Sequence, residues 1–318
     1  MITLSEIEDA ARELPSQVLK TPLLRFEALS KKTGADLLLK AENLQVTGSY
    51  KSRAAFTILN KLTDQQKERG AAISSSGNFA AAFAYMGTLL GIPTSVVMMK
   101  KTSPFKVERT RQFGAEVVFC DDHNQARWDT LEQLAVDRGL ATINTWEDAN
   151  VLRGHGTLGL EILDQAPNVD AIVVPVSSSG LIAGIGAAVK SIRPEVKIIG
   201  VQPEGSQALY QSFRQKSLCE VDEPNTICDA LIAARPGAAP FEHVLAYVDD
   251  VVLVSDDQAK KAIRELAGDA KLVAEPGGAV AVAAVQAGVV DVVGKTVVAV
   301  VSGGNIAQTL LGEILRCE

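Results

Sequence analysis

Short apolar runs alternate along this chain with longer segments in which apolar and polar positions recur at helical spacing. The apolar runs predict buried strands at Asp36–Lys40, Ala71–Ser74, Thr94–Met98, Ala115–Phe119, Ala171–Val176, Lys197–Val201, Val251–Val254 and Thr296–Val301. The longer segments predict helices at Asn78–Leu90, Pro104–Phe113, Arg127–Arg138, Leu181–Ile192, Asp256–Ala267 and Asn305–Leu315. This alternation is typical of an α/β protein, in which helices connect the strands of a parallel sheet.

The repeats fall into two series, which predict two α/β units with a cleft between them. We expect a small mobile domain over residues 69–145 and a large domain made of residues 1–68 and 146–318. The uncharged stretch Ala171–Val189 is about as long as a membrane helix requires. It contains Pro175, three consecutive serines and three glycines, so we interpret it as a strand, a tight loop and a helix start.

Composition narrows the function classes. The chain has 318 residues, 47% of them hydrophobic, and a net charge of -7, which argues against nucleic-acid and membrane partners. Four scattered cysteines without a C-x-x-C pair indicate a reduced, cytoplasmic protein. The three histidines are far apart, so no zinc site is expected. At the N-terminus, Ser5 and Glu8 fit the capping box of a helix, and a signal peptide is not expected.

Three Ser/Gly loops follow predicted strands and open predicted helices, at residues 74–78, 177–181 and 302–305. Backbone N–H groups at such positions bind anions, and ligands of open α/β sheets lie at the carboxyl ends of strands. Any one of these loops could simply cap a helix. Their combination with Lys51, which follows the turn Thr47–Tyr50 and could form a Schiff base, favours an enzyme.

Two segments resemble nucleotide-binding motifs but lack the spacing or the neighbouring elements that those motifs require. Gly154–Gly159 matches G-x-G-x-x-G, but no predicted strand leads directly into it. Gly294-Lys295-Thr296 resembles the end of a P-loop, but the preceding glycine, Gly288, is one residue too far away and the segment runs into a strand. We therefore expect no nucleotide site.

The order of motifs along the chain resembles the fold-type II pyridoxal-phosphate enzymes, and within them the serine/threonine dehydratase and serine racemase group. The segments that carry the resemblance are 42–53, 75–78, 154–157, 177–181, 200–204, 226–229, 274–276 and 302–305. The resemblance spans nearly the whole chain. It implies two open twisted sheets with flanking helices, in the tryptophan synthase beta-like arrangement, and a homodimer.

By this resemblance, Lys51 would hold pyridoxal 5'-phosphate through a Schiff base and would later remove the α-proton of the substrate. The other residues that the resemblance assigns to the cofactor are Tyr50, Asn78, Ser177, Ser178, Ser179, Gly180, Leu181, Glu275 and Ser302. Ser302 would meet the pyridine nitrogen. Its neutral hydroxyl would make the cofactor a weaker electron sink than a carboxylate would, which favours elimination.

The substrate would be held by Ser49, Ser75, Asn78 and His155, and Ser76 matches the serine that acts on the face opposite the lysine in racemases of this group. Several positions depart from the family pattern. Phe79 stands where histidine is common, and we expect a core aromatic. His155 replaces a common glutamine and could contact the substrate or be a hydrogen-bonded structural histidine.

Two further departures concern charge. Arg153 could bind a second substrate carboxylate, although a surface arginine is the favoured interpretation. Gln202, Ser206 and Ala208 stand where some relatives bind a divalent cation, so no metal is expected.

The resulting hypothesis is a dehydratase that converts serine, threonine or a related β-hydroxy amino acid to a 2-oxo acid and ammonia. The alternatives are an amino-acid racemase, a β-replacement enzyme of the cysteine synthase type, and a non-catalytic binder of the cofactor or of an amino acid. An intact Lys51 argues against the last, since a pure binder has no need of a reactive lysine.

Overall fold

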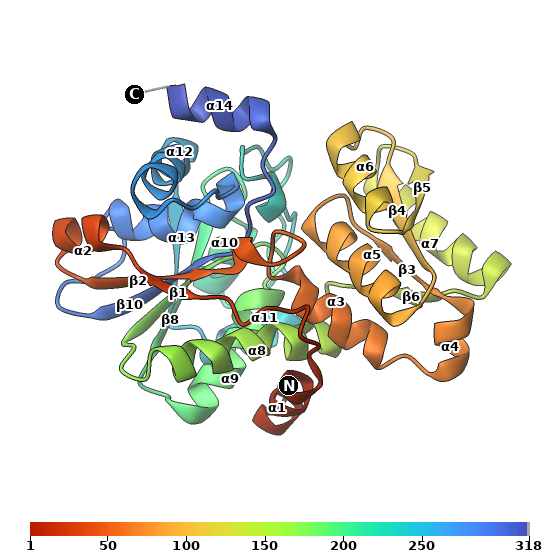
Figure 1. Cartoon of the computed structure of the whole chain (residues 1–318), viewed down its shortest axis with the longest axis horizontal. Helices are drawn as coiled ribbons and strands as arrows, with labels where there is room; N and C mark the ends of the chain where they lie inside the picture. Colours follow the sequence, from red (N-terminus) through yellow and green to blue (C-terminus); the bar gives the residue numbers. More distant parts are fainter. Residues whose placement is uncertain (317–318) are drawn as a thin grey trace.

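The computed structural model describes residues 1–316, and the strands of this part of the chain form two sheets (Figure 1). The larger sheet has the order β1-β2-β10-β7-β8-β9 and the smaller one β5-β4-β3-β6. Only β1 runs antiparallel to its neighbour. The strands are β1 (Leu23–Arg25), β2 (Asp36–Ala41), β3 (Ala71–Ser74), β4 (Thr94–Met99), β5 (Glu116–Cys120), β6 (Ala141–Ile143), β7 (Ala171–Pro175), β8 (Lys197–Pro203), β9 (Asp250–Val254) and β10 (Thr296–Val301).

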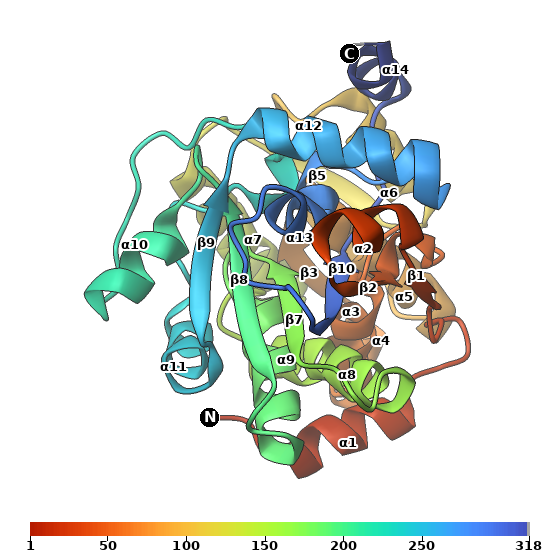
Figure 2. The same cartoon turned by 90° about the vertical axis from the view of Figure 1, so that its left-hand side faces the viewer.

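Helices cover both faces of the large sheet (Figure 2). One face carries α2 (Glu27–Thr33), α12 (Asp256–Glu265), α13 (Pro276–Gln286) and α14 (Gln308–Arg316). The other carries α8 (Ala149–Gln165), α9 (Gly180–Ile192), α10 (Ala208–Gln215) and α11 (Ala238–Tyr247), and α1 (Leu4–Glu13) packs on α8. The small sheet is flanked by α5 (Asn78–Leu90), α6 (Pro104–Gln112) and α7 (Asn124–Arg138).

Two more helices, α3 (Lys51–Asn60) and α4 (Asp64–Arg69), connect the large sheet to the small one. Single turns occur at η1 (Glu42–Leu44), η2 (Asp229–Leu231) and η3 (Leu266–Ala270). One apolar core contains buried residues of α3, α5, β3, α8 and α9 together. Because burial of this surface is the main favourable term in folding, the two sheets are joined by a shared core.

The predicted fold class is confirmed, and all eight predicted strands exist with small shifts of their ends. The predicted capping box is wrong by two positions, since the Thr3 hydroxyl caps α1 and Glu6 returns the bond. The last helix begins at Gln308, not at Asn305, so the third Ser/Gly loop does not open directly into a helix.

Gly154–Gly159 lies inside α8, in agreement with the expectation that this pattern is not a nucleotide motif. A Cβ on Gly154 would stand 2.6 Å from the Ala54 Cα, and a Cβ on Gly184 of α9 would stand 2.4 Å from the Leu152 oxygen. These glycines therefore allow α8 to pack closely against α3 and α9.

Within the described residues, Cys120, Cys219 and Cys228 are free thiols, and Cys317 lies outside them. None of the helices described is both long and apolar enough to span a bilayer. In the same part of the chain, no three His, Cys, Asp or Glu side chains gather in a way that could hold a metal ion.

Candidate active site

The parallel strands β2, β10 and β7 end at one edge of the large sheet, and the segments that follow them meet there. The Tyr50 N–H donates to the Ser302 carbonyl at 3.2 Å, and Gly304 N–H donates to the Gly48 carbonyl at 2.9 Å. Ser49 and Gly303 form an isolated antiparallel bridge. The turn before Lys51 and the Ser/Gly loop after β10 are therefore fixed to each other through their backbones.

Lys51 is the first residue of α3, which begins at this edge of the sheet. The amine nitrogen lies 4.4 Å from the centroid of the Tyr50 ring and 5.4 Å from that of Phe79. Burial lowers the pKa of Lys51 to about 7, although the Glu275 carboxylate acts in the opposite direction. Near neutral pH a large fraction of the amine is therefore uncharged and nucleophilic.

A narrow pocket with a free volume of about 10 Å³ lies between Lys51 and the loop after β7. Its lining includes Tyr50, Lys51, His155 and residues 177–181. The loop opens α9, whose first N–H groups lack helical acceptors and carry the positive end of the helix dipole. Backbone N–H groups at such a helix start are suited to bind an anion such as a phosphate.

Ser179 supports the same interpretation. It has φ 80° and ψ -4°, a left-handed conformation that glycine adopts without strain and serine does not. Its hydroxyl is buried and has no hydrogen-bond partner. A strained residue with an unpaired buried donor is typical of a site built for a ligand.

His155 projects from α8 into the same pocket. His155 is buried, and neither ring nitrogen makes a hydrogen bond of regular geometry, although the backbone N–H of Gly180 acts on the ring as a donor. Its ring centroid lies 4.8 Å from that of Tyr50. Burial, reinforced by the charge of Lys51, holds the pKa of His155 well below its usual value, so the ring is neutral.

On the other side of Lys51, three polar side chains form a chain of hydrogen bonds. Asn78, the first residue of α5, donates to the Glu275 carboxylate at 2.5 Å, and its carbonyl accepts from the Asn305 amide at 2.6 Å. A Cβ on Gly303 would stand 2.3 Å from Glu275 Oε1, so only glycine leaves room for this carboxylate. Burial raises the pKa of Glu275 to about 7, against the opposing effect of the Asn78 hydrogen bond.

The predicted substrate residues lie around this chain of bonds. Ser49 is fully buried and its hydroxyl has no partner. Ser75 and Ser76 lie in the loop between β3 and α5, immediately before Asn78, and the Ser76 hydroxyl accepts a bond from Thr102 at 3.1 Å. Ser302 is buried directly after β10. The roles of these residues stay predictions, but the fold brings their backbones to one place.

The two remaining departures have clear positions. Phe79 belongs to the core shared by the two sheets, as expected, and its ring also contacts the space around the Lys51 amine. Arg153 makes an ion pair with Glu6 and donates to Asn150 at 2.8 Å. It is therefore engaged in fixing α1 on α8, in keeping with the structural interpretation.

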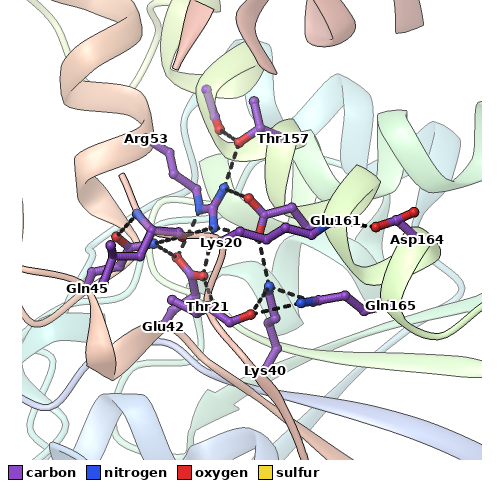
Figure 3. Close-up of polar contacts among 12 residues, drawn as sticks. Lys20, Thr21, Lys40, Glu42, Gln45, Arg53, Thr157, Glu161, Asp164 and Gln165 are labelled. Carbon is purple, nitrogen blue, oxygen red and sulfur yellow. Dashed lines mark hydrogen bonds and ion pairs between the residues drawn. The ribbon is translucent and has the colours of Figure 1, made fainter. Parts of the chain in front are cut away.

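The start of α3 is fixed by a cluster of buried charges around Arg53, two residues after Lys51 in the chain (Figure 3). The Arg53 guanidinium bonds both oxygens of Glu42 at 2.9 Å and both oxygens of Glu161 at 2.7 and 2.9 Å. Lys40, also fully buried, donates to Glu161, to Gln165 and to the Thr21 carbonyl, each at 2.8 Å. Two cations thus face two carboxylates, and every donor of the Lys40 ammonium is used.

This buried cluster determines protonation as well as position. Although burial acts to raise it, Arg53 holds the pKa of Glu42 below its usual range. Because Arg53 lies two residues after Lys51, the cluster holds the first turn of α3 rigidly against β2 and α8.

Three residues of the site were not predicted from the sequence. Asn305 was noted only as part of a Ser/Gly loop, and Thr145 carried no motif although it lines the pocket. Arg109, on α6 of the small sheet, donates to the Thr47 carbonyl at 3.1 Å. No local pattern marks Arg109, because its helix is rich in charge and its contact is 62 residues distant in sequence.

The arrangement fits the cofactor that the sequence motifs imply. A desolvated amine, a flanking aromatic ring and an anion-binding loop line one pocket, and Ser179 offers a buried hydroxyl that still lacks a partner. Lys51 would hold the aldehyde end, and residues 177–181 would hold the phosphate.

Comparison with known proteins agrees with this geometry. The family model described as pyridoxal-phosphate dependent enzyme matches residues 14–303. An L-threonine ammonia-lyase of Thermotoga maritima is 38% identical over 99% of this chain and 79% of its own length. The structure of maize serine racemase matches with a TM-score of 0.94 and 29% identity, covering 98% of this chain and 96% of that one. The serine racemase of Dictyostelium discoideum matches with a TM-score of 0.91 and 30% identity, covering 96% and 99%.

Proposed function

Because the chain belongs to the family of pyridoxal-phosphate-dependent enzymes, we propose that it is a dehydratase of β-hydroxy amino acids, which releases a 2-oxo acid and ammonia from threonine, serine or a related substrate. The L-threonine ammonia-lyase among its relatives supports this reaction. The observation that carries the proposal is the Lys51 amine, desolvated to a pKa of about 7 and facing a pocket with an anion-binding loop.

Bound pyridoxal phosphate supplies the electron sink that makes the α-proton of an amino acid removable. The protein supplies the base: Lys51, uncharged near neutral pH, accepts the α-proton on its amine nitrogen. Asn78 and Glu275 hold each other in position by a hydrogen bond next to Gly303. Ser302 would offer a hydroxyl, not a carboxylate, to the ring nitrogen of the cofactor, and a neutral partner there would favour elimination.

The proposal is tested with the purified protein and a panel of L- and D-β-hydroxy amino acids, with 2-oxo acid and ammonia measured. We expect release of both products from at least one of them and an absorbance band of the bound cofactor. Borohydride should fix the cofactor irreversibly on Lys51, and Lys51→Ala should abolish both the band and the activity. A panel without any product would overturn the dehydratase assignment and leave the cofactor assignment standing.

Racemisation is the second candidate, favoured by the position of Ser76 beside Asn78 and by the similarity to serine racemase. D-serine formed from L-serine, compared with 2-oxo acid release, separates the two activities. Ser76→Ala should remove D-serine formation and leave elimination measurable. We also propose, from the family resemblance, a homodimer in the cytoplasm, and sedimentation velocity measures the oligomeric state.

A further inference from the structure

Arg109 presents a positive charge to the candidate site that the roles proposed above do not use. It extends from α6 of the small sheet to the turn before Lys51, where the Thr47 carbonyl accepts from Nη2 at 3.1 Å. The same carbonyl accepts from Asn305 at 2.9 Å, and Asn305 in turn donates to Asn78. Arg109 is thus connected to Asn78 through two residues, Thr47 and Asn305.

Among the described residues, no carboxylate lies within ion-pair distance of Arg109, whereas Lys106 on the same helix pairs with Asp229. Arg109 Nε is shielded from solvent and has no acceptor. The nearest counter-charge is Glu275, which acts on Arg109 only at longer range and is itself shifted toward the neutral form by burial. The guanidinium is half-buried and its Cζ lies 5.7 Å from the centroid of the Phe113 ring, so it has lost part of its hydration without gaining an anion. A bound carboxylate would offset that cost.

The geometry of the guanidinium selects the kind of anion. With Nε free and a second N–H remaining on Nη2, Arg109 can present two parallel donors, which match the two oxygens of a carboxylate. The phosphate loop 177–181 belongs to the pocket on the other side of Lys51, and Arg109 does not line that pocket. The anion for Arg109 is therefore a part of the substrate.

We propose that Arg109 determines specificity by binding a second acidic group, so that the preferred substrate is a 3-hydroxy amino acid with a side-chain carboxylate, of the 3-hydroxyaspartate type. The inference rests on the proposed dehydratase function and names its substrate class. Arg153, the cation that sequence reasoning offered for this role, is paired with Glu6. Because Nε is covered, the substrate carboxylate reaches it only when α6 moves away from the turn at Thr47.

The test compares kcat/KM for the stereoisomers of 3-hydroxyaspartate with kcat/KM for threonine and serine. We expect the wild-type enzyme to prefer a 3-hydroxyaspartate isomer by at least about tenfold, since a charged hydrogen bond contributes roughly 10- to 100-fold. Arg109→Gln, which keeps an amide donor for Thr47, should remove that preference with little change for threonine. Arg109→Lys should restore part of it. Arg111→Gln is the matched control, since Arg111 is an exposed cation of the same helix beside Phe119.

Binding of succinate to the cofactor-loaded protein, measured by calorimetry against butyrate, gives a readout independent of turnover. Succinate should bind the wild-type protein and lose about tenfold or more in affinity in Arg109→Gln. Two results would overturn the proposal: equal kcat/KM of the wild-type enzyme for threonine and 3-hydroxyaspartate, or an equal loss of kcat/KM for every substrate in Arg109→Gln. Either would leave Arg109 with a structural role only, as a contact between α6 and the turn at Thr47. If no amino acid is turned over but succinate binding depends on Arg109, the dicarboxylate site stands and the dehydratase function falls.

Discussion

At the scale of single residues, burial shifts the pKa of several groups in the site away from their ordinary values. Lys51, Glu275 and His155 all have a pKa displaced toward the uncharged form, and burial is the largest cause in each case. Such displacements gather where a protein has to move protons near neutral pH.

The pKa of Lys51 predicts how cofactor uptake depends on pH. Only the uncharged amine attacks an aldehyde, so the rate at which apoprotein takes up pyridoxal phosphate should rise about tenfold per unit below pH 7 and level off above about pH 8. Stopped-flow absorbance measures this rate. A lysine with an unshifted pKa of 10.5 would give a rate that still rises between pH 8 and 10, and that profile would contradict the structure.

Ser179 predicts a trade between stability and binding. Ser179→Gly removes the left-handed strain and a buried unpaired hydroxyl, so the apoprotein should gain about 1–2 kcal/mol in its free energy of unfolding. Its affinity for pyridoxal phosphate should fall if the hydroxyl serves the phosphate. Ser178→Gly is the control, since positive φ is confined to Ser179 within this loop. A variant that gains stability and binds the cofactor as well as the wild type would remove Ser179 from the phosphate site.

At the scale of elements, sequence patterns predicted what depends on neighbours in the chain. Continuous apolar runs such as Thr296–Val301 were recognisable as central strands because both faces are covered. The strands β1 and β6 were not predicted, because three residues are too few to show an apolar run or an alternation of apolar and polar positions. Helix α3 was missed because Tyr50 makes no side-chain cap, and α13 because its glycines and valines carry no helical pattern.

The residues of the candidate site also fall into those that the local sequence marks and those that only the fold brings into place. Lys51 and the Ser/Gly loops were recognisable because their residue types are characteristic of the chemistry. Arg109 and the pairing of Arg153 with Glu6 depend on contacts between elements distant in sequence, 147 residues apart in the second case, and no local pattern reports them. Charged residues in a sequence are therefore only candidates for binding a substrate, and the fold determines which of them already have an ion-pair partner within the protein.

The buried charges around Arg53 predict a large effect of one substitution on the packing of α3. Arg53→Met should lower the free energy of unfolding by about 3–5 kcal/mol, because it leaves Glu42 buried without its cation. The double variant Arg53→Met/Glu42→Gln, which restores the charge balance, should lose less. Urea unfolding measures both. Arg12→Met, which breaks an exposed pair with Asp9, is the control and should cost less than about 1 kcal/mol.

At the scale of the whole molecule, the contacts of the small sheet fall into two kinds. Its helix α5 packs on α3 within the apolar core that both sheets share. Helix α6 adds only Val107 to this core and meets the large sheet's side of the site through the polar contacts of Lys106 and Arg109. An apolar core resists sliding apart, and exposed ion pairs break easily. We therefore expect that, when the predicted small domain moves, α5 stays packed on α3 and the polar contacts of α6 break.

This asymmetry predicts a local pattern of hydrogen exchange. Lys106→Met removes a pair whose Asp229 side chain is 51% exposed, so the amides of α6 should exchange up to about fivefold faster, while those of α5 stay unchanged. Added salt should have the same effect on the wild-type protein and none on the variant, because salt screens the charge that the variant lacks. If α5 and α6 accelerate together, the small sheet moves as one body and the shared core does not hold it.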